Sequence, residues 1–108
     1  GRIERGDLAA ADLREMIRGY VGSFAGTVGS VVLGCTHYPF VRRQIAEVLG
    51  GDVIFYDGGA GTARQLGHRL GECGLLADEA HAGSVSFASS EDTPDELALY
   101  REFFEMEL

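Results

Sequence analysis

The sequence of 108 residues contains few cysteines and prolines, no tryptophan and little positive charge. Its two cysteines, Cys35 and Cys73, are too few and too far apart for a disulfide framework or a zinc site, so both are expected as free thiols. No apolar run approaches the roughly 18 residues that a membrane-spanning helix needs, and the first residues lack the apolar stretch of a signal peptide. We therefore expect a cytoplasmic protein without a bound metal.

The shortage of basic residues also limits the class of partner. Nine basic residues, all of them arginines, stand against 17 acidic residues, a formal net charge of −8. Nucleic acid and anionic membrane surfaces would be repelled by this charge, so neither is expected as a partner. The remaining composition is that of an ordinary globular domain, with 45% apolar residues. A compact chain of this length has a radius of gyration of about 13 Å and a sizeable core.

The hydrophobic pattern predicts four helices that alternate with three strands. An apolar stripe of helical period marks the first helix: Leu13, Ile17, Tyr20, Val21 and Phe24. Pro39 suits the first position of a second helix, and Thr93 with Pro94 is typical of a capped helix start. The continuous apolar runs at 31–33 and 53–56 predict strands buried on both faces, and a weaker run at 85–88 predicts a third.

Two further helices have expected inward faces. The third is expected to begin in the glycine-rich stretch 57–61 and to end near Gly71 and Gly74, with Ala63, Leu66, Leu70 and Cys73 facing inward. In the last helix, Leu97, Tyr100 and Phe104 are expected to face inward.

This order of elements predicts an α/β fold of three layers, α/β/α, with a small parallel sheet as the middle layer. Parallel strands need crossover connections, and the helices supply them. Three strands leave edges that need cover from more chain or from a partner. Residues 1–108 are therefore expected to form a single partial domain.

Two loops are candidates for a binding site. Ligands of parallel sheets bind beyond the carboxyl ends of the strands, where the loops 34–39 and 57–62 are expected. Both loops lead into predicted helix N-termini, which favour an anion such as a carboxylate. The sequence therefore predicts a small acidic ligand.

The first loop carries reactive groups. The predicted strand-to-helix position of Cys35 favours a reactive thiolate, and His37 could orient it or share its proton. Gly34 would allow close approach of a ligand, and Thr36 would donate hydrogen bonds to a carboxylate. From these residues alone, a buried structural cysteine is the more frequent alternative.

The string Val-Val-Leu-Gly-Cys-Thr-His-Tyr-Pro-Phe at 31–40 resembles the second catalytic-cysteine motif of glutamate racemases, in the aspartate/glutamate racemase superfamily. The continuation His-Tyr-Pro is characteristic of the glutamate enzymes. Two flanking segments, 3–6 and 53–63, also resemble the family. The resemblance implies half of a two-domain, flavodoxin-like architecture, in which this chain is the C-terminal catalytic half and the N-terminal half is absent.

The resemblance also implies a cofactor-independent, two-base interconversion of L- and D-glutamate that supplies peptidoglycan synthesis. In this reaction Cys35 is one of two acid-base cysteines and His37 assists it, while Gly34, Thr36 and His37 bind substrate. Glu4 matches an acidic residue near the family's site, and Asp57 is either a further site residue or a turn and cap residue. Because the partner cysteine belongs to the absent half, the chain alone is expected to be inactive.

Two alternatives stay open. The first is a non-catalytic carboxylate-binding or dimerisation module of the same fold. The second is a related racemase that acts on aspartate, which the presence of His37 weakens. The sequence also leaves open a homodimer in which two copies of Cys35 face each other.

Overall fold

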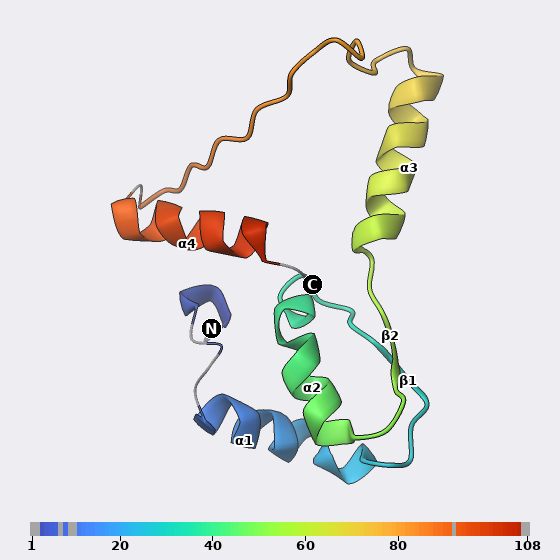
Figure 1. The fold of residues 1–108 in the computed structure, drawn as a ribbon, viewed down its shortest axis with the longest axis vertical. Helices are drawn as coiled ribbons and strands as arrows, with labels where there is room; N and C mark the ends of the chain where they lie inside the picture. The colour runs from blue at the N-terminus through green and yellow to red at the C-terminus, as the bar shows by residue number, and fades with distance from the viewer. Residues whose placement is uncertain (1–2, 7, 9–10, 92, 107–108) are drawn as a thin grey trace.

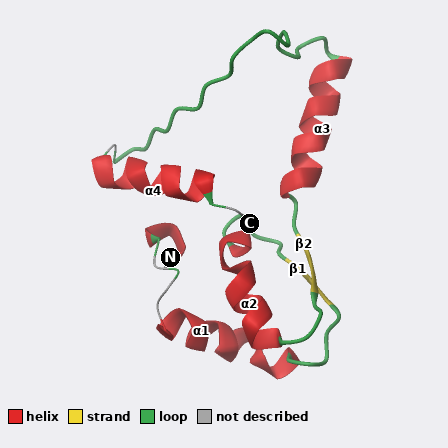
Figure 2. Ribbon diagram, viewed as in Figure 1, coloured by secondary structure: helices red, strands yellow, loops and turns green. Residues whose placement is uncertain are grey.

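The computed structural model describes residues 3–6, 8, 11–91 and 93–106, and it has a pair of parallel strands with helices packed against one side (Figure 1, Figure 2). The elements in chain order are η1 (Ile3–Arg5), α1 (Ala11–Val21), η2 (Gly22–Phe24), β1 (Ser30–Val32), η3 (Tyr38–Val41), α2 (Arg42–Leu49), β2 (Ile54–Tyr56), α3 (Gly59–Glu72) and α4 (Pro94–Glu105), where η denotes a 3-10 helix. The α/β class and the small parallel sheet are as predicted. None of the described helices is long and apolar enough to cross a membrane.

The sheet contains β1 and β2, which pair in parallel with Val31 opposite Phe55. Both strands lie within one residue of their predicted positions. The prediction of a third strand at 85–88 was wrong, because this segment has no regular secondary structure. A strand is stabilised by hydrogen bonds to a neighbouring strand, and none of the described residues pairs with this segment.

The prediction that the strands are buried on both faces was also wrong. Successive side chains of a strand point to opposite faces, and here only one face is covered. Val31 and Phe55 pack against the core under α1 and α2. On the other face the exposed fractions are 75% for Val32 and 57% for Ile54. No described helix shields this face of the sheet.

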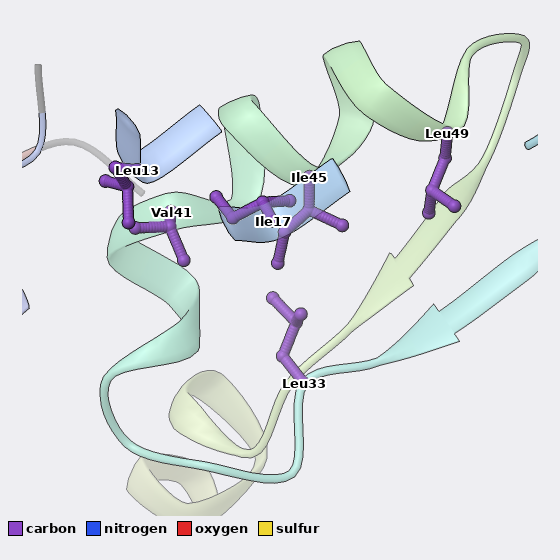
Figure 3. Packing of buried hydrophobic residues seen from close by; sticks show 6 residues of the cluster. All are labelled: Leu13, Ile17, Leu33, Val41, Ile45 and Leu49. Atoms are coloured by element: carbon purple, nitrogen blue, oxygen red, sulfur yellow. The ribbon is translucent and has the colours of Figure 1, made fainter. Parts of the chain in front are cut away.

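The core is small and lies between α1, α2 and the end of β1. Its buried side chains are Leu13, Ile17, Leu33, Val41, Ile45 and Leu49. In Figure 3, Leu33 points toward Ile17 and Ile45, and Leu49 lies farther along α2. An ion pair of 2.8 Å between Arg14 and Glu47 links α1 to α2 at the edge of this cluster. The predicted stripe of the first helix is therefore only half buried, because Tyr20 and Phe24 remain exposed.

The expectation of a compact chain with a large core was wrong. The radius of gyration is 17.5 Å and the dimensions are 49 × 35 × 20 Å. Figure 1 shows α3 running away from the sheet, followed by a long connection that returns to α4. Helix α3 has no buried residue, so the predicted inward face that includes Leu66 and Cys73 is exposed instead. Its predicted end is confirmed, since Gly74 follows it at a φ of +65°.

Helix α4 begins as predicted and packs differently from the prediction. The backbone N–H of Glu96 donates to the Thr93 hydroxyl at 3.3 Å, which is the expected N-terminal cap. The predicted inward residue Phe104 is 63% exposed and contacts only the ring of Phe87 among the described aromatics. The neighbouring Phe103 instead packs on Phe40, with ring centroids 4.7 Å apart.

Candidate functional site

The candidate site lies on the loop that follows β1. The backbone N–H of Leu33 donates to the carbonyl of Tyr56 at 2.7 Å, which extends the pairing of the strands by one residue. The Leu33 side chain is buried in the core. The backbone hydrogen bond to β2 and this buried side chain together fix the start of the loop. After 34–37 the chain enters η3, with Pro39 in its first turn, and then α2. The helix predicted from Pro39 thus begins with a 3-10 turn.

Three side chains meet at this loop. The Sγ of Cys35 lies 3.8 Å from Nδ1 of His37, and Nε2 of His37 lies 3.6 Å from Oε1 of Glu4. The imidazole therefore stands between a thiol and a carboxylate and uses a different nitrogen toward each. The side chains of His37 and Glu4 are 43% and 53% exposed, and Cys35 is half-buried, so the group is accessible from solvent.

Such an arrangement can move protons. A thiol beside an imidazole can transfer its proton to the ring nitrogen, and the thiolate that results is a base and a nucleophile. The Glu4 carboxylate faces the second ring nitrogen and can orient the imidazole toward Cys35. Glu4 and His37 are 33 positions apart in the sequence (37 − 4), so tertiary structure brings the carboxylate to the loop.

Gly34 and Thr36 lie beside these groups on the same loop and are exposed. A Cβ added to Gly34 would meet no heavy atom within 4 Å, and Gly34 is not among the positive-φ glycines. Neither packing nor backbone conformation of the described chain therefore requires glycine at this position. Open space over the backbone is what the close approach of a ligand needs.

Asp57 lies at the same end of the sheet, directly after β2. Its Oδ1 accepts a hydrogen bond of 2.9 Å from the backbone N–H of Gly59, the first residue of α3. This bond satisfies one of the free N–H groups of the helix start, so Asp57 has a structural task as a cap. Among the described residues, no hydrogen bond joins Asp57 to Cys35 or His37.

Cys73 is remote from this group. It is exposed and follows the last residue of α3, whose first residue comes shortly after β2, at the end of the sheet that carries the site loop. Fourteen helical residues span about 21 Å, so the length of α3 separates the two ends. Cys73 is therefore not placed to act with Cys35. The described residues also contain no cluster of three His, Cys, Asp or Glu side chains that could hold a metal ion.

A large apolar hollow opens beside the core, and the sequence reasoning missed it. Its volume is about 620 Å³, and its exposed rim includes Met16, Tyr20, Phe24, Val32 and Tyr38. The sequence signal was the apolar stripe of α1, which continues beyond the residues that the chain itself buries.

No protein-family model matches the sequence. The chain is 46% identical over 96 residues to a glutamate racemase of Pseudomonas entomophila. The aligned region covers 88% of this chain and 36% of that relative. It is 36% identical over 104 residues to a glutamate racemase of Clostridium botulinum, covering 95% of this chain and 40% of the relative. A glutamate racemase of Herpetosiphon aurantiacus is 39% identical over 107 residues, covering 97% and 41%.

The fold agrees with these similarities. A crystal structure of a glutamate racemase from Francisella tularensis, in complex with D-glutamate, superposes with a TM-score of 0.76 over 99% of this chain and 40% of that chain, at 23% identity. The chain thus spans about two fifths of the length of the curated relatives it matches. In sequence, the chain is therefore similar over most of its length to part of several glutamate racemases, and its fold is that of part of one.

Proposed function

We propose that the complete protein to which this chain belongs is a cofactor-independent glutamate racemase that interconverts L- and D-glutamate, with Cys35 as one of its two acid-base cysteines. The observation that carries the proposal is the contact of Cys35 with His37 and of His37 with Glu4. The similarity to proteins named glutamate racemase supports the reaction and the substrate.

In this reaction the Cys35 thiolate attacks the α-hydrogen on one face of glutamate. The C–H bond breaks, an S–H bond forms on Cys35, and the electron pair stays on the α-carbon. A second thiol on the opposite face then gives its proton to that carbon, so the configuration inverts. A positioned acid or base contributes typically a factor of about 10² to 10⁴ in rate.

His37 has the role of proton partner of Cys35. Its Nδ1 accepts the thiol proton and returns it when the reaction runs in the other direction. Glu4 stabilises the imidazolium that results, through Nε2. The exposed Gly34 and Thr36 leave room for the substrate and offer a hydroxyl donor to its carboxylate.

The second cysteine is expected in a further domain, which we propose to be the N-terminal half of the racemase. Cys73 cannot take this part because α3 carries it away from Cys35. The apolar hollow beside α1 is the surface that this half would cover, since exposed apolar patches of this size usually mark an interaction site. The relatives are more than twice as long as the chain, and their additional length is enough for a further domain. The chain alone is then inactive.

The test is exchange of the α-hydrogen of L- and D-glutamate in deuterated water, followed by NMR. The complete protein is expected to exchange and racemise both enantiomers, whereas Cys35→Ala is expected to be inactive and Cys73→Ala to remain active. The chain alone is expected to show no turnover. Turnover by Cys35→Ala would contradict the proposal.

Two further measurements separate the alternatives. Binding of glutamate without any exchange by the complete protein would favour a non-catalytic carboxylate-binding module, and faster turnover of aspartate than of glutamate would favour a related racemase. A role in peptidoglycan synthesis predicts that the complete protein restores growth of a bacterium that requires D-glutamate, and that Cys35→Ala does not.

A further inference from the structure

Helix α4 contacts both segments that carry the proposed acid-base group. The first contact is between Leu99 and the turn that contains Glu4. A Cβ built on Gly6 would lie only 2.7 Å from Cδ1 of Leu99, so the Leu99 methyl group lies directly against the Gly6 backbone. The N–H of Gly6 donates to the carbonyl of Ile3 at 2.9 Å, which closes the turn around Glu4. Figure 1 shows η1 beside α4.

The second contact is between Phe103 and the segment that follows His37. The ring of Phe103 packs on Phe40 of η3 at 4.7 Å, and the N–H of Phe40 donates to the carbonyl of His37 at 3.3 Å. Residues 99 and 103 are one turn apart and therefore lie on the same face of α4. One face of α4 thus contacts both the turn that contains Glu4 and the segment that follows His37.

From these contacts we infer that Leu99 is a positioning residue of the racemase site, which holds Glu4 at His37 by pressing on the turn at Gly6. The inference rests on the proposed function and adds a residue from the last helix to it. Glu4 and His37 are 3.6 Å apart, beyond hydrogen-bond length, so their contact alone does not hold η1 against the loop. Leu99 touches no reacting group and acts through Glu4.

Other contacts keep η1 folded when Leu99 is shortened. Ile3 and Leu8 pack against the core, and the amide of Gln44 donates to the carbonyl of Leu8 at 3.0 Å. Helix α4 keeps a separate contact with η3 through the rings of Phe103 and Phe40. The expected result of Leu99→Ala is therefore a displaced Glu4 in a folded protein.

The experiment compares Leu99→Ala with three variants of the complete protein: Glu4→Gln, the double variant and Leu99→Met. Phe104→Ala is the matched control, because Phe104 is exposed on another face of α4. Leu99→Ala is expected to lower kcat by about 10-fold to 100-fold, as misplacement of about 1 Å does, with little change in KM. Leu99→Met is expected to retain activity, and the double variant to lose no more than Glu4→Gln alone.

A second measurement does not require racemase activity. Iodoacetamide is allowed to alkylate the folded protein, and mass spectrometry gives the rates at Cys35 and at the exposed Cys73 separately. The quantity compared is the rate at Cys35 divided by the rate at Cys73. Leu99→Ala is expected to lower this ratio by the same factor as Glu4→Gln, and Phe104→Ala to leave it unchanged. If the complete protein does not racemise glutamate but this pattern holds, the proposed function fails and the positioning role stands. Multiplicative losses in the double variant, or an equal loss in Phe104→Ala, would overturn the positioning role.

Discussion

The Sγ of Cys35 and Nδ1 of His37 lie 3.8 Å apart on one short loop, with a single residue between them. Because both side chains leave the same loop, this contact needs no distant part of the chain. The contact of His37 with Glu4 does, since Glu4 lies at the start of the chain. The contact of Cys35 with His37 and the contact of His37 with Glu4 are therefore expected to respond to different substitutions.

Replacing the imidazole tests the proton partner. In the complete protein His37→Asn is expected to lower kcat by about 10² or more, because the thiol loses the group that takes its proton. His68→Asn is the control, since His68 is exposed on α3 and pairs with Glu72 of the same helix. Racemisation rates for both enantiomers give the result, and equal losses in the two variants would contradict the assignment.

The small core predicts an uneven response to truncation. Leu49→Ala is expected to lower the free energy of unfolding by about 2–5 kcal/mol, because the side chain is only 2% exposed. Leu66→Ala, which removes the same atoms from an α3 side chain that is 58% exposed, is expected to change it by less than about 0.5 kcal/mol. Urea denaturation of the protein measures both. A large loss for Leu66→Ala would mean that α3 packs on another part of the complete protein.

Gly6 and Gly26 separate two costs of adding a side chain. Both have a positive φ, +71° and +69°, so alanine at either position costs about 1–2 kcal/mol. Only at Gly6 does the new Cβ also collide with Leu99. Gly6→Ala is therefore expected to destabilise the protein more than Gly26→Ala, and Leu99→Ala in the Gly6→Ala background is expected to remove the excess. Equal unfolding free energies for the two alanine variants would show that Leu99 does not press on this turn.

The network at the start of α4 predicts a dependence on pH. The Tyr100 hydroxyl donates to Oε1 of Glu96 at 2.6 Å, and Ser89 donates at 3.0 Å. The pKa of Glu96 is lowered mainly by the hydrogen bond from Tyr100 and next by the hydrogen bond from Ser89. Desolvation of the carboxylate acts in the opposite direction and raises this pKa. A lowered folded-state pKa means that the stabilisation is present above the unfolded value of about 4.3 and is lost as the pH falls through the folded value.

The variant Tyr100→Phe is therefore expected to be less stable than the parent at neutral pH, with the difference shrinking as the pH falls below about 4. The measurement is the denaturation midpoint at a series of pH values. Tyr20→Phe, at an exposed position of α1, serves as the control. A difference that stays constant down to pH 3 would contradict the role of the Glu96 carboxylate.

Local patterns in the sequence determined the two strands, the four α-helices and the loop with Cys35 and His37. Apolar period, Pro39, the Thr93 cap and the glycine ends act within a few residues, so they can be read without knowledge of the rest of the chain. The motif around Cys35 likewise predicted the similarity to glutamate racemases. These features depend on neighbours in sequence.

Tertiary structure alone decided which apolar surfaces are covered. Periodicity shows that Tyr20, Val32 and Phe104 lie on apolar faces, yet it cannot show whether anything packs on them, and all three are exposed. The segment 85–88 has strand character and no strand to pair with. The approach of Glu4 to His37, and of Leu99 to Gly6, likewise depends on contacts between distant segments, because a short apolar or charged side chain carries no local signal of its partner.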